Sequence, residues 1–594
     1  MCGIAGIMTS GNRAPDAALL DRLSLALAHR GPDGQGRHIQ GNVGFLQNRL
    51  AIIDLVTGDQ PLYEPGGAAL VANGEIYNYV ELRQDMAARG LGNSFKTNSD
   101  FEPALHLYRR DGLGYLDQLR GMYAIALHDP VAGQLVLSRD PFGIKPLYYM
   151  ELPQGLAFAS EPQALIAAGL VPATLVPSAR DELVQLQFTT GRETPFAGIF
   201  RLLPGETLVV ADGRIVERRR RAALPAEGPV DWSEGEALER LDQALIDSVR
   251  VHQRSDVPYG MFLSGGIDSS AVLALMARLN DRPVRCFTAG FSGTAAADER
   301  QHARKLANEL GAKHSEVDFS EADFHALLPA IAASVDDPTA DYAILPTWKL
   351  AREARGEVKV VLSGEGGDEM FAGYGRYRSA MRPWWLGGRM ARGRGMFDGL
   401  GVLREDKPNW RDGIAAVEAT ESLPGRSRLQ IAQAVDCAHW LPNDLLTKLD
   451  RCLMAHAIEG RTPFLDPVVA SVAFRLPDKL KVKGQLGKWL LRRWLQERLP
   501  SADAYTRKRG FTVPVAEWIA AAAGRLGALV AAQPGVTELC RPDRVQILFR
   551  DLASKGGKRR GFAAWTLLYY ALWHQRHMLG FAPEGDITAA LARR

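Results

Sequence analysis

The chain has 594 residues, of which 46% are hydrophobic and 23% charged, a composition typical of a soluble globular protein. Its length exceeds what one hydrophobic core usually reaches, so we expect more than one domain. The net charge of +3 argues against nucleic acid or an anionic membrane as a partner. Five cysteines without CxxC spacing exclude a disulfide framework and a zinc site. No apolar run suits a membrane span or a signal peptide, so the sequence predicts a cytoplasmic protein.

The chain begins with a cysteine directly behind the initiator methionine. Removal of Met1 would make Cys2 the N-terminal residue. Its thiol and its own α-amine then form a nucleophile and a base, because an α-amine titrates near neutral pH and can accept the thiol proton directly or through a water. The alternative is an inert cysteine at a frayed terminus. Taken alone, the residue leaves both interpretations open.

Up to about residue 215, short apolar runs alternate with Gly, Pro, Asn and Asp. This pattern predicts a mixed α/β domain of layered sheets. The expected strands include residues 43–46, 69–72, 122–127, 134–137 and 207–210, and the expected helices are 17–28, 79–89 and 101–110. A polar stretch with Pro and Gly over 216–234 predicts a linker, and its four adjacent arginines indicate a solvated segment rather than a phosphate site.

From about residue 235, predicted strands alternate with predicted helices. The expected helices are 236–251, 271–279 and 299–310, and the expected strands are 259–263, 285–289, 314–319 and 358–362. This alternation predicts a parallel, doubly wound sheet, in which ligands bind at the carboxyl ends of the strands. Ser264 and Ser363 fall at two such ends. Residues from about 376 onward are expected to be mainly helical.

The hexapeptide SGGIDS at 264–269 joins a predicted strand to a predicted helix. Glycines leave backbone N–H groups able to surround phosphate oxygens, and the helix N-terminus adds partial positive charge. Asp268 is suited to the Mg²⁺ that accompanies a polyphosphate. A glycine-rich tight turn is the alternative, which the full hexapeptide after an apolar strand makes the weaker interpretation.

This hexapeptide resembles the loop of ATP pyrophosphatases, which cleave ATP between its α- and β-phosphates to adenylate a carboxylate. Residues 362–374 (LSGEGGDEMFAGY) resemble the second signature of asparagine synthetases and their amide-forming relatives. The resemblance implies that Asp368 shares the metal with Asp268 and that Glu365 helps to form or use the acyl-adenylate. The ATP-binding residues that it implies are Leu263, Ser264, Gly265, Gly266, Asp268, Ser269, Ala289, Ser363 and Gly364.

Later segments also resemble this family. Residues 448–451 and 459–466 resemble segments that line the synthetase site. Residues 487–492 contain Lys488, which the resemblance implies is a catalytic cation that neutralises charge on the α-phosphate. The stretch 507–514 matches the family pattern, and its basic residues are equally consistent with a solvated run or with phosphate ligands.

The N-terminal third resembles class II glutamine amidotransferases, whose nucleophile is the N-terminal residue. The resemblance lies in Cys2 and in residues 29–34, 48–54, 60–62, 73–78, 98–100 and 139–143. Arg49 can form a bidentate pair with the α-carboxylate of glutamine, and Glu75 and Asp100 suit its α-ammonium. The Asn73 side chain and the Gly74 N–H can form an oxyanion hole. The glutamine-binding residues that it implies are Arg49, Leu50, Ile52, Ile53, Asn73, Gly74, Glu75 and Asp100.

Together these resemblances imply a two-domain α/β enzyme. A glutaminase with αββα layers is expected over 2–215, and an ATP-pyrophosphatase-type synthetase with a doubly wound parallel sheet and added helices over 235–580. Cys2 would hydrolyse glutamine through a thioester, and the ammonia would pass through an internal channel to an acyl-adenylate made from Mg-ATP. With aspartate as acceptor, the products are asparagine, glutamate, AMP and diphosphate. Relatives are commonly homodimers, so a homodimer is also expected.

The acceptor is left open by two departures from well-studied asparagine synthetases. Tyr342 stands near the position of an arginine, and Gly367 replaces a serine. The alternative is therefore the same mechanism on a cell-envelope, polysaccharide or secondary-metabolite carboxylate. A β-lactam-forming synthetase typically lacks Cys2, and amidotransferases for sugar phosphate or phosphoribosyl substrates lack the hexapeptide. A non-catalytic scaffold would not need the candidate catalytic residues of both the glutaminase and the synthetase halves.

Overall fold

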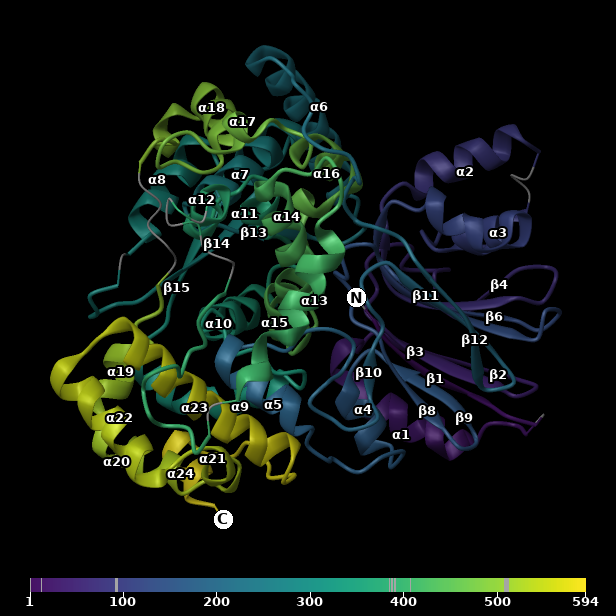
Figure 1. The fold of residues 1–594 in the computed structure, drawn as a ribbon. Coiled ribbons are helices and arrows are strands. Elements are labelled where there is room, and N and C mark those ends of the chain that lie inside the picture. The colour runs from purple at the N-terminus through teal and green to yellow at the C-terminus, as the bar shows by residue number, and fades with distance from the viewer. Residues whose placement is uncertain are drawn as a thin grey trace.

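The computed structural model describes residues 2–593 except 12, 91–93, 297, 384, 386–387, 389–391, 406 and 507–511. The two halves of the chain lie against each other, with the strands of the N-terminal half on one side and the helix-rich C-terminal half on the other (Figure 1). Among the described residues, no helix is both long enough and apolar enough to cross a membrane.

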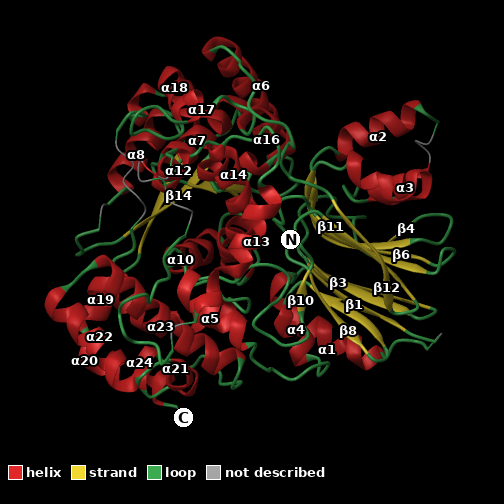
Figure 2. Ribbon diagram, in the orientation of Figure 1, coloured by secondary structure: helices red, strands yellow, loops and turns green. Residues whose placement is uncertain are grey.

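The N-terminal half contains two antiparallel sheets that pack face to face (Figure 2). The first sheet has the spatial order β10 (Phe200–Arg201), β8 (Tyr148–Leu152), β9 (Gly155–Ala159), β1 (Gly3–Thr9), β3 (Val43–Arg49) and β2 (Gly34–Gln40). The second has the order β12 (Arg214–Arg220), β11 (Glu206–Ala211), β7 (Gln134–Arg139), β6 (Gly121–Asp129), β5 (Ala69–Ile76) and β4 (Leu62–Tyr63).

Strand β1 shows why the sheets are layered between helices. Successive side chains of a strand point to opposite faces. Ile4 and Met8 are buried between the two sheets, whereas Ala5 and Ile7 pack in the cluster that contains helix α1. Helices α1 (Ala17–Leu27) and α4 (Pro162–Ala167) cover the first sheet, and α2 (Tyr79–Ala88) and α3 (Glu102–Asp111) lie with the second. This arrangement confirms the predicted αββα fold.

The C-terminal half is built on a five-stranded parallel sheet. Its order is β15 (Lys313–Asp318), β14 (Arg285–Gly290), β13 (Tyr259–Phe262), β16 (Val360–Leu362) and β17 (Glu459–Arg461). The chain proceeds outward from β13 to β15 and then continues on the other side of β13 with β16 and β17. The reversal between β13 and β16 opens a crevice at their carboxyl ends. The doubly wound parallel sheet that the sequence predicts is thereby confirmed.

Helices cover both faces of this sheet. Cys286 of β14 packs in the cluster formed with α6 (Glu234–His252), α7 (Ile267–Leu279) and α8 (Arg300–Glu309). The next residue, Phe287, packs in the cluster formed with α9 (Glu321–Ser334), α10 (Ile344–Ala354) and α15 (Thr447–Met454). Six helices at the C-terminus extend the second layer: α19 (Val515–Ala521), α20 (Ala523–Ala531), α21 (Pro534–Leu539), α22 (Pro542–Lys555), α23 (Lys558–His577) and α24 (Ile587–Ala592).

The remaining α-helices that the structure describes are α5 (Pro177–Leu186), α11 (Gly367–Met370), α12 (Gly375–Met381), α13 (Asp412–Glu421), α14 (Arg428–Val435), α16 (Pro467–Ala473), α17 (Asp478–Lys481) and α18 (Trp489–Arg498). Between α14 and α15 the chain forms a π-helix, η6, over Asp436–Leu446. Runs of π-helix are rare and are found frequently at functional sites.

Three boundaries differ from the sequence-based expectation. Helix α7 begins at Ile267 rather than at residue 271, because Gly266 caps it, and the predicted phosphate loop therefore includes the first helical turn. The predicted linker begins inside β12. This edge strand is rich in charged residues, so its sequence lacks the apolar run that predicts a strand. Helix α24 lies beyond the predicted end at 580 and is held by a bond from Gln533 Nε2 to the Leu591 carbonyl (2.8 Å).

Candidate active sites

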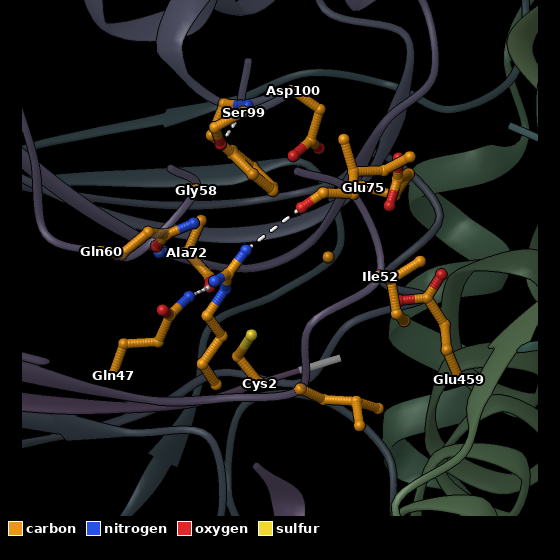
Figure 3. A pocket seen from close by; sticks show the side chains of 15 residues that line it. Cys2, Gln47, Ile52, Gly58, Gln60, Ala72, Glu75, Ser99, Asp100 and Glu459 are labelled. Atoms are coloured by element: carbon orange, nitrogen blue, oxygen red, sulfur yellow. Dashed lines mark hydrogen bonds between the residues drawn. The ribbon is translucent and has the colours of Figure 1, made fainter. Parts of the chain in front are cut away.

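The first site is a small pocket between the end of β5 and the start of β1, with Cys2 in its wall (Figure 3). Cys2 is 8% exposed, and burial raises the pKa of its thiol. Most of the predicted glutamine-binding residues line the pocket: Arg49, Leu50, Ile52, Ile53, Gly74, Glu75 and Asp100. The structure therefore brings together predicted residues as far apart in the sequence as Cys2 and Asp100.

Strand β5 presents Asn73 and Gly74 to Cys2. The Cys2 backbone N–H donates to Asn73 Oδ1 (3.0 Å), and Asn73 Nδ2 is buried without a partner in the described part of the chain. Gly74 has φ 147°, and a Cβ there would lie 2.0 Å from the Met122 carbonyl oxygen. Only glycine fits this position. An amide donor and a side-chain-free backbone thus lie beside the thiol, as an oxyanion hole requires.

Two buried carboxylates face the same pocket. Asp100 accepts a hydrogen bond from the Ile76 N–H (2.8 Å), yet burial raises its pKa to about 7. Glu75 accepts from Arg461 Nη2 (3.1 Å), and its Oε1 has no partner within the described ranges. Burial and the Asp100 charge raise the pKa of Glu75. A ligand with an ammonium group would stabilise both carboxylates in their charged form.

Arg49 reaches the pocket from the end of β3. Its Nη2 donates to the carbonyls of Asp54 (2.5 Å) and Ile53 (3.2 Å), and its Nη1 pairs with Asp59 (2.6 Å). The Asp59 side chain is 81% exposed, so this ion pair contributes little and a substrate carboxylate can replace it.

Strand β17 is a part of the first site that sequence reasoning missed. Residues 459–466 are predicted to line the synthetase site, but Glu459 lines the Cys2 pocket, and Arg461 binds both Glu75 and Glu459 (2.6 Å). The prediction was wrong for these two residues. A three-residue strand of charged and glycine residues has no apolar alternation that could have revealed it.

The segment after Lys448 also divides between the two sites. Lys448 and Leu449 line the synthetase cavity as predicted, whereas Asp450 accepts two bonds from Arg30 of the N-terminal half (2.8 and 3.0 Å). Arg451 pairs with Asp336 (2.7 Å). The prediction that Asp450 and Arg451 line the synthetase site was therefore wrong, because they form a buried ion network at the contact between the halves.

The second site is a cavity of about 1390 Å³ at the carboxyl ends of β13 and β16. All nine residues predicted to bind ATP line it, namely Leu263, Ser264, Gly265, Gly266, Asp268, Ser269, Ala289, Ser363 and Gly364. Ser264 Oγ accepts from the Gly266 N–H (3.3 Å) and bonds to Ser269 Oγ (3.0 Å). These bonds hold the loop curved at the N-terminus of α7, where phosphate is stabilised.

Asp268 and Asp368 meet at Lys488 in the same cavity. Lys488 Nζ binds both carboxylates, at 2.6 Å from Asp368 Oδ1, and they raise the pKa of the lysine although burial opposes this. Lys488 has φ 57°, an unusual left-handed conformation at the start of α18. Gly367 lies close by, since a Cβ there would be 2.4 Å from Asp268 Oδ1.

The donors at this point fit a magnesium ion that is also bound by substrate. In the described ranges, no cluster of three or more His, Cys, Asp and Glu side chains could hold a metal. Two carboxylates that converge on one cation, however, are the usual protein share of a Mg²⁺ site, since phosphates and water supply the other ligands. Asp268 and Asp368 meet this requirement.

Glu365 lies farther along the cavity and pairs with Lys448 (3.2 Å), which also binds Asp341 (3.0 Å). Tyr342 lines the cavity and stacks on Phe562, with ring centroids 5.5 Å apart. The basic residues at 507–509 lie outside the described residues, so both interpretations of them, a solvated run and phosphate ligands, stay open.

Comparisons with known proteins agree with this two-site arrangement. The asparagine synthase family model matches residues 240–575, and a glutamine amidotransferase domain model matches residues 1–220. The chain is 33% identical to asparagine synthetase [glutamine-hydrolyzing] 1 of Bacillus subtilis, over 97% of this chain and 96% of that protein.

Two further relatives are similar over most of the chain. A putative asparagine synthetase [glutamine-hydrolyzing] of Mycobacterium tuberculosis is 34% identical, over 97% of both chains. Asparagine synthetase B [glutamine-hydrolyzing] of Escherichia coli is 31% identical, over 87% of this chain and 83% of that one. The synthase model covers more than half of the chain, and the relatives match nearly all of it. The chain therefore belongs to the glutamine-hydrolysing asparagine synthetase family, whose members use ATP, and it is an enzyme of glutamine-dependent amide synthesis.

Proposed function

We propose that the enzyme converts ATP, L-aspartate, L-glutamine and water to AMP, diphosphate, L-asparagine and L-glutamate. The observation that carries this proposal is the pairing, in one chain, of a buried Cys2 pocket with a crevice where Asp268, Asp368 and Lys488 meet. The first site supplies ammonia and the second activates a carboxylate. We also expect a cytoplasmic homodimer.

The glutaminase half of the reaction needs Met1 to be removed. The freed α-amine of Cys2 then accepts the thiol proton, and the sulfur attacks the amide carbon of glutamine. Asn73 Nδ2 and the Gly74 N–H stabilise the oxyanion, the C–N bond breaks, and ammonia leaves with that proton. Water hydrolyses the thioester to glutamate. Arg49 would bind the α-carboxylate, and Glu75 and Asp100 the α-ammonium.

The synthetase half activates the acceptor. Backbone N–H groups of residues 264–269 would bind the β- and γ-phosphates, while a carboxylate oxygen of aspartate attacks the α-phosphorus and diphosphate leaves. Asp268 and Asp368 would hold Mg²⁺, which neutralises phosphate charge when bound. Lys488 is suited to stabilise charge on the phosphates, and Glu365 would help to form or use the acyl-adenylate. Ammonia then attacks the acyl carbon, and AMP leaves.

The test is a product assay on the purified protein with glutamine, ATP, Mg²⁺ and aspartate. We expect one diphosphate and one asparagine for each glutamate that the coupled reaction releases. Diphosphate without asparagine, or diphosphate release that does not depend on aspartate, would refute aspartate as the acceptor. Amide synthesis on another carboxylate would then be the remaining function.

A further inference from the structure

We propose that Arg392 binds a second anionic group of the acceptor, distinct from the carboxylate that is activated. This inference rests on the proposed function, because it concerns the acceptor of the same reaction. For aspartate the group would be the α-carboxylate. The class of acceptor that follows is a dianion, such as an amino dicarboxylic acid.

Arg392 is a half-buried cation in the wall of the synthetase cavity. Its guanidinium lies between two aromatic rings, 4.8 Å from the centroid of Phe188 and 4.7 Å from that of Trp440. Its Nε is buried with no hydrogen-bond partner, and no ion pair to Arg392 exists among the described residues.

A neighbouring arginine shows what Arg392 lacks. Arg376 lies 4.0 Å from the Trp440 ring centroid and pairs with the buried Asp436 (2.8 Å), which balances its charge. Arg392 shares Trp440 with Arg376 but forms no ion pair within the described ranges, so the Asp436 and Asp444 charges act on it only from a distance. Burial and the Arg376 charge lower the pKa of Arg392 to about 10. Because an unpaired charge in a desolvated site is costly, an anion that enters the cavity will bind there favourably.

The π-helix η6 joins this arginine to the acyl-forming end of the cavity. It carries both Trp440, which contacts Arg392, and Asp444, whose carboxylate accepts from the Trp440 indole N–H and the Thr339 hydroxyl. Lys448 follows one turn later and pairs with Glu365 (3.2 Å). The unpaired cation and the proposed reacting carboxylate site are thus linked along one continuous stretch of chain.

The same region offers two carboxylates for a positive group. Asp341 and Asp444 both line the cavity, and burial together with the Asp341 charge raises the pKa of Asp444 to about 7. An ammonium group beside them would favour the ionised form. Arg392 together with Asp444 and with Asp341, which also pairs with Lys448, complements a zwitterionic acceptor better than a neutral sugar or a simple fatty acid.

The experiment compares three variants in the ammonium-dependent reaction, which avoids the glutaminase site. Arg392→Met removes the charge, Arg392→Lys keeps it, and Arg394→Met is the matched control on an exposed arginine of the same segment. We expect Arg392→Met to raise the KM for aspartate roughly 30-fold or more, as loss of a buried charge pair does, with the KM for ATP unchanged. Arg392→Lys should recover part of the loss, and Arg394→Met should behave as wild type.

A second substrate makes the contact specific. β-Alanine is aspartate without its α-carboxylate, so Arg392→Met should leave the KM for β-alanine unchanged. A cycle that combines the two enzymes with the two substrates should therefore show coupling between the Arg392 side chain and the α-carboxylate. Glutaminase activity, which uses the other site, reports correct folding of each variant. An unchanged aspartate KM in folded Arg392→Met would overturn the inference while asparagine synthesis by the wild type stands. A raised KM for ATP with an unchanged KM for aspartate would also overturn the inference, because Arg392 would then bind a phosphate of ATP.

The failure of the proposed function has a different signature. Wild-type diphosphate release with another dicarboxylate but not with aspartate would reject the proposed reaction. A raised KM for that dicarboxylate in Arg392→Met would still support the role of Arg392. An acceptor with only one anionic group, or no diphosphate release with any dicarboxylate, would overturn the inference.

Discussion

Replacing Asp100 with asparagine should stabilise the protein and impair glutamine use at the same time. Asp100 is 6% exposed, and burial raises its pKa from 3.8 to about 7. This shift corresponds to roughly 4 kcal/mol of destabilisation at pH values above 7, where the carboxylate is charged in both folded and unfolded states. Asparagine keeps an oxygen that can accept from the Ile76 N–H and removes the buried charge.

The pH dependence follows from the direction of the shift. Below pH 3.8 the carboxyl group is neutral in both states, so its burial has no electrostatic effect on the free energy of unfolding. Between pH 3.8 and about 7 only the unfolded state ionises, and folding stability falls as the pH rises. The advantage of Asp100→Asn should therefore be roughly 2 kcal/mol at pH 5 and approach roughly 4 kcal/mol at pH 8.

Calorimetry of the full chain at pH 5 and pH 8 measures this difference. We expect the transition of the N-terminal half to rise by roughly 8–16 °C at pH 8 and by roughly 4–8 °C at pH 5. Asp117→Asn is the control, because the Asp117 side chain is 73% exposed and its ion pair with Arg221 contributes little. The glutamine KM should increase roughly 30-fold or more in Asp100→Asn, with ammonium-dependent synthesis retained. A lower Tm at pH 8, or an equal gain at both pH values, would refute this reasoning.

Three other substitutions separate the two sites. Cys2→Ala should abolish glutamine-dependent synthesis but retain ammonium-dependent synthesis, and loss of both in a folded variant would contradict the division of labour. Gly74→Ala, whose Cβ would lie 2.0 Å from the Met122 oxygen, should reduce glutaminase activity and lower the Tm in a thermal melt. Lys488→Met should slow diphosphate release roughly 100-fold while glutaminase activity persists, and normal release would exclude an electrostatic role for Lys488.

Several features were predictable because they depend on residues that are close in sequence. The hexapeptide at 264–269 combines a strand end, glycines and a helix start within six residues, and the structure forms that loop. Strand β5 was predictable from its apolar run, and it brings Asn73 and Gly74 with it. The later start predicted for α7 shows the limit of such reasoning, since a glycine can end a loop or cap a helix.

Other features were not predictable because they depend on contacts between distant segments. Arg461 lies in a segment that resembles the family, but no neighbouring residue in the sequence indicates that it binds Glu75, 386 residues earlier in the chain. Asp450 similarly meets Arg30 across 420 residues. A charged residue is predicted from sequence to be exposed, because the partners that allow its burial are not its neighbours in the sequence.

By itself, the sequence determined the chemistry that each half can perform, since a nucleophile behind the initiator methionine and a phosphate loop are local arrangements. Only the tertiary structure decided which charges are balanced. It pairs Lys488 with two carboxylates and Arg376 with Asp436, and it leaves Arg392 between two rings with no ion pair to any residue that the structure describes. The physical reason is that the energy of a buried charge depends on what folding places around it, which the order of residues does not reveal.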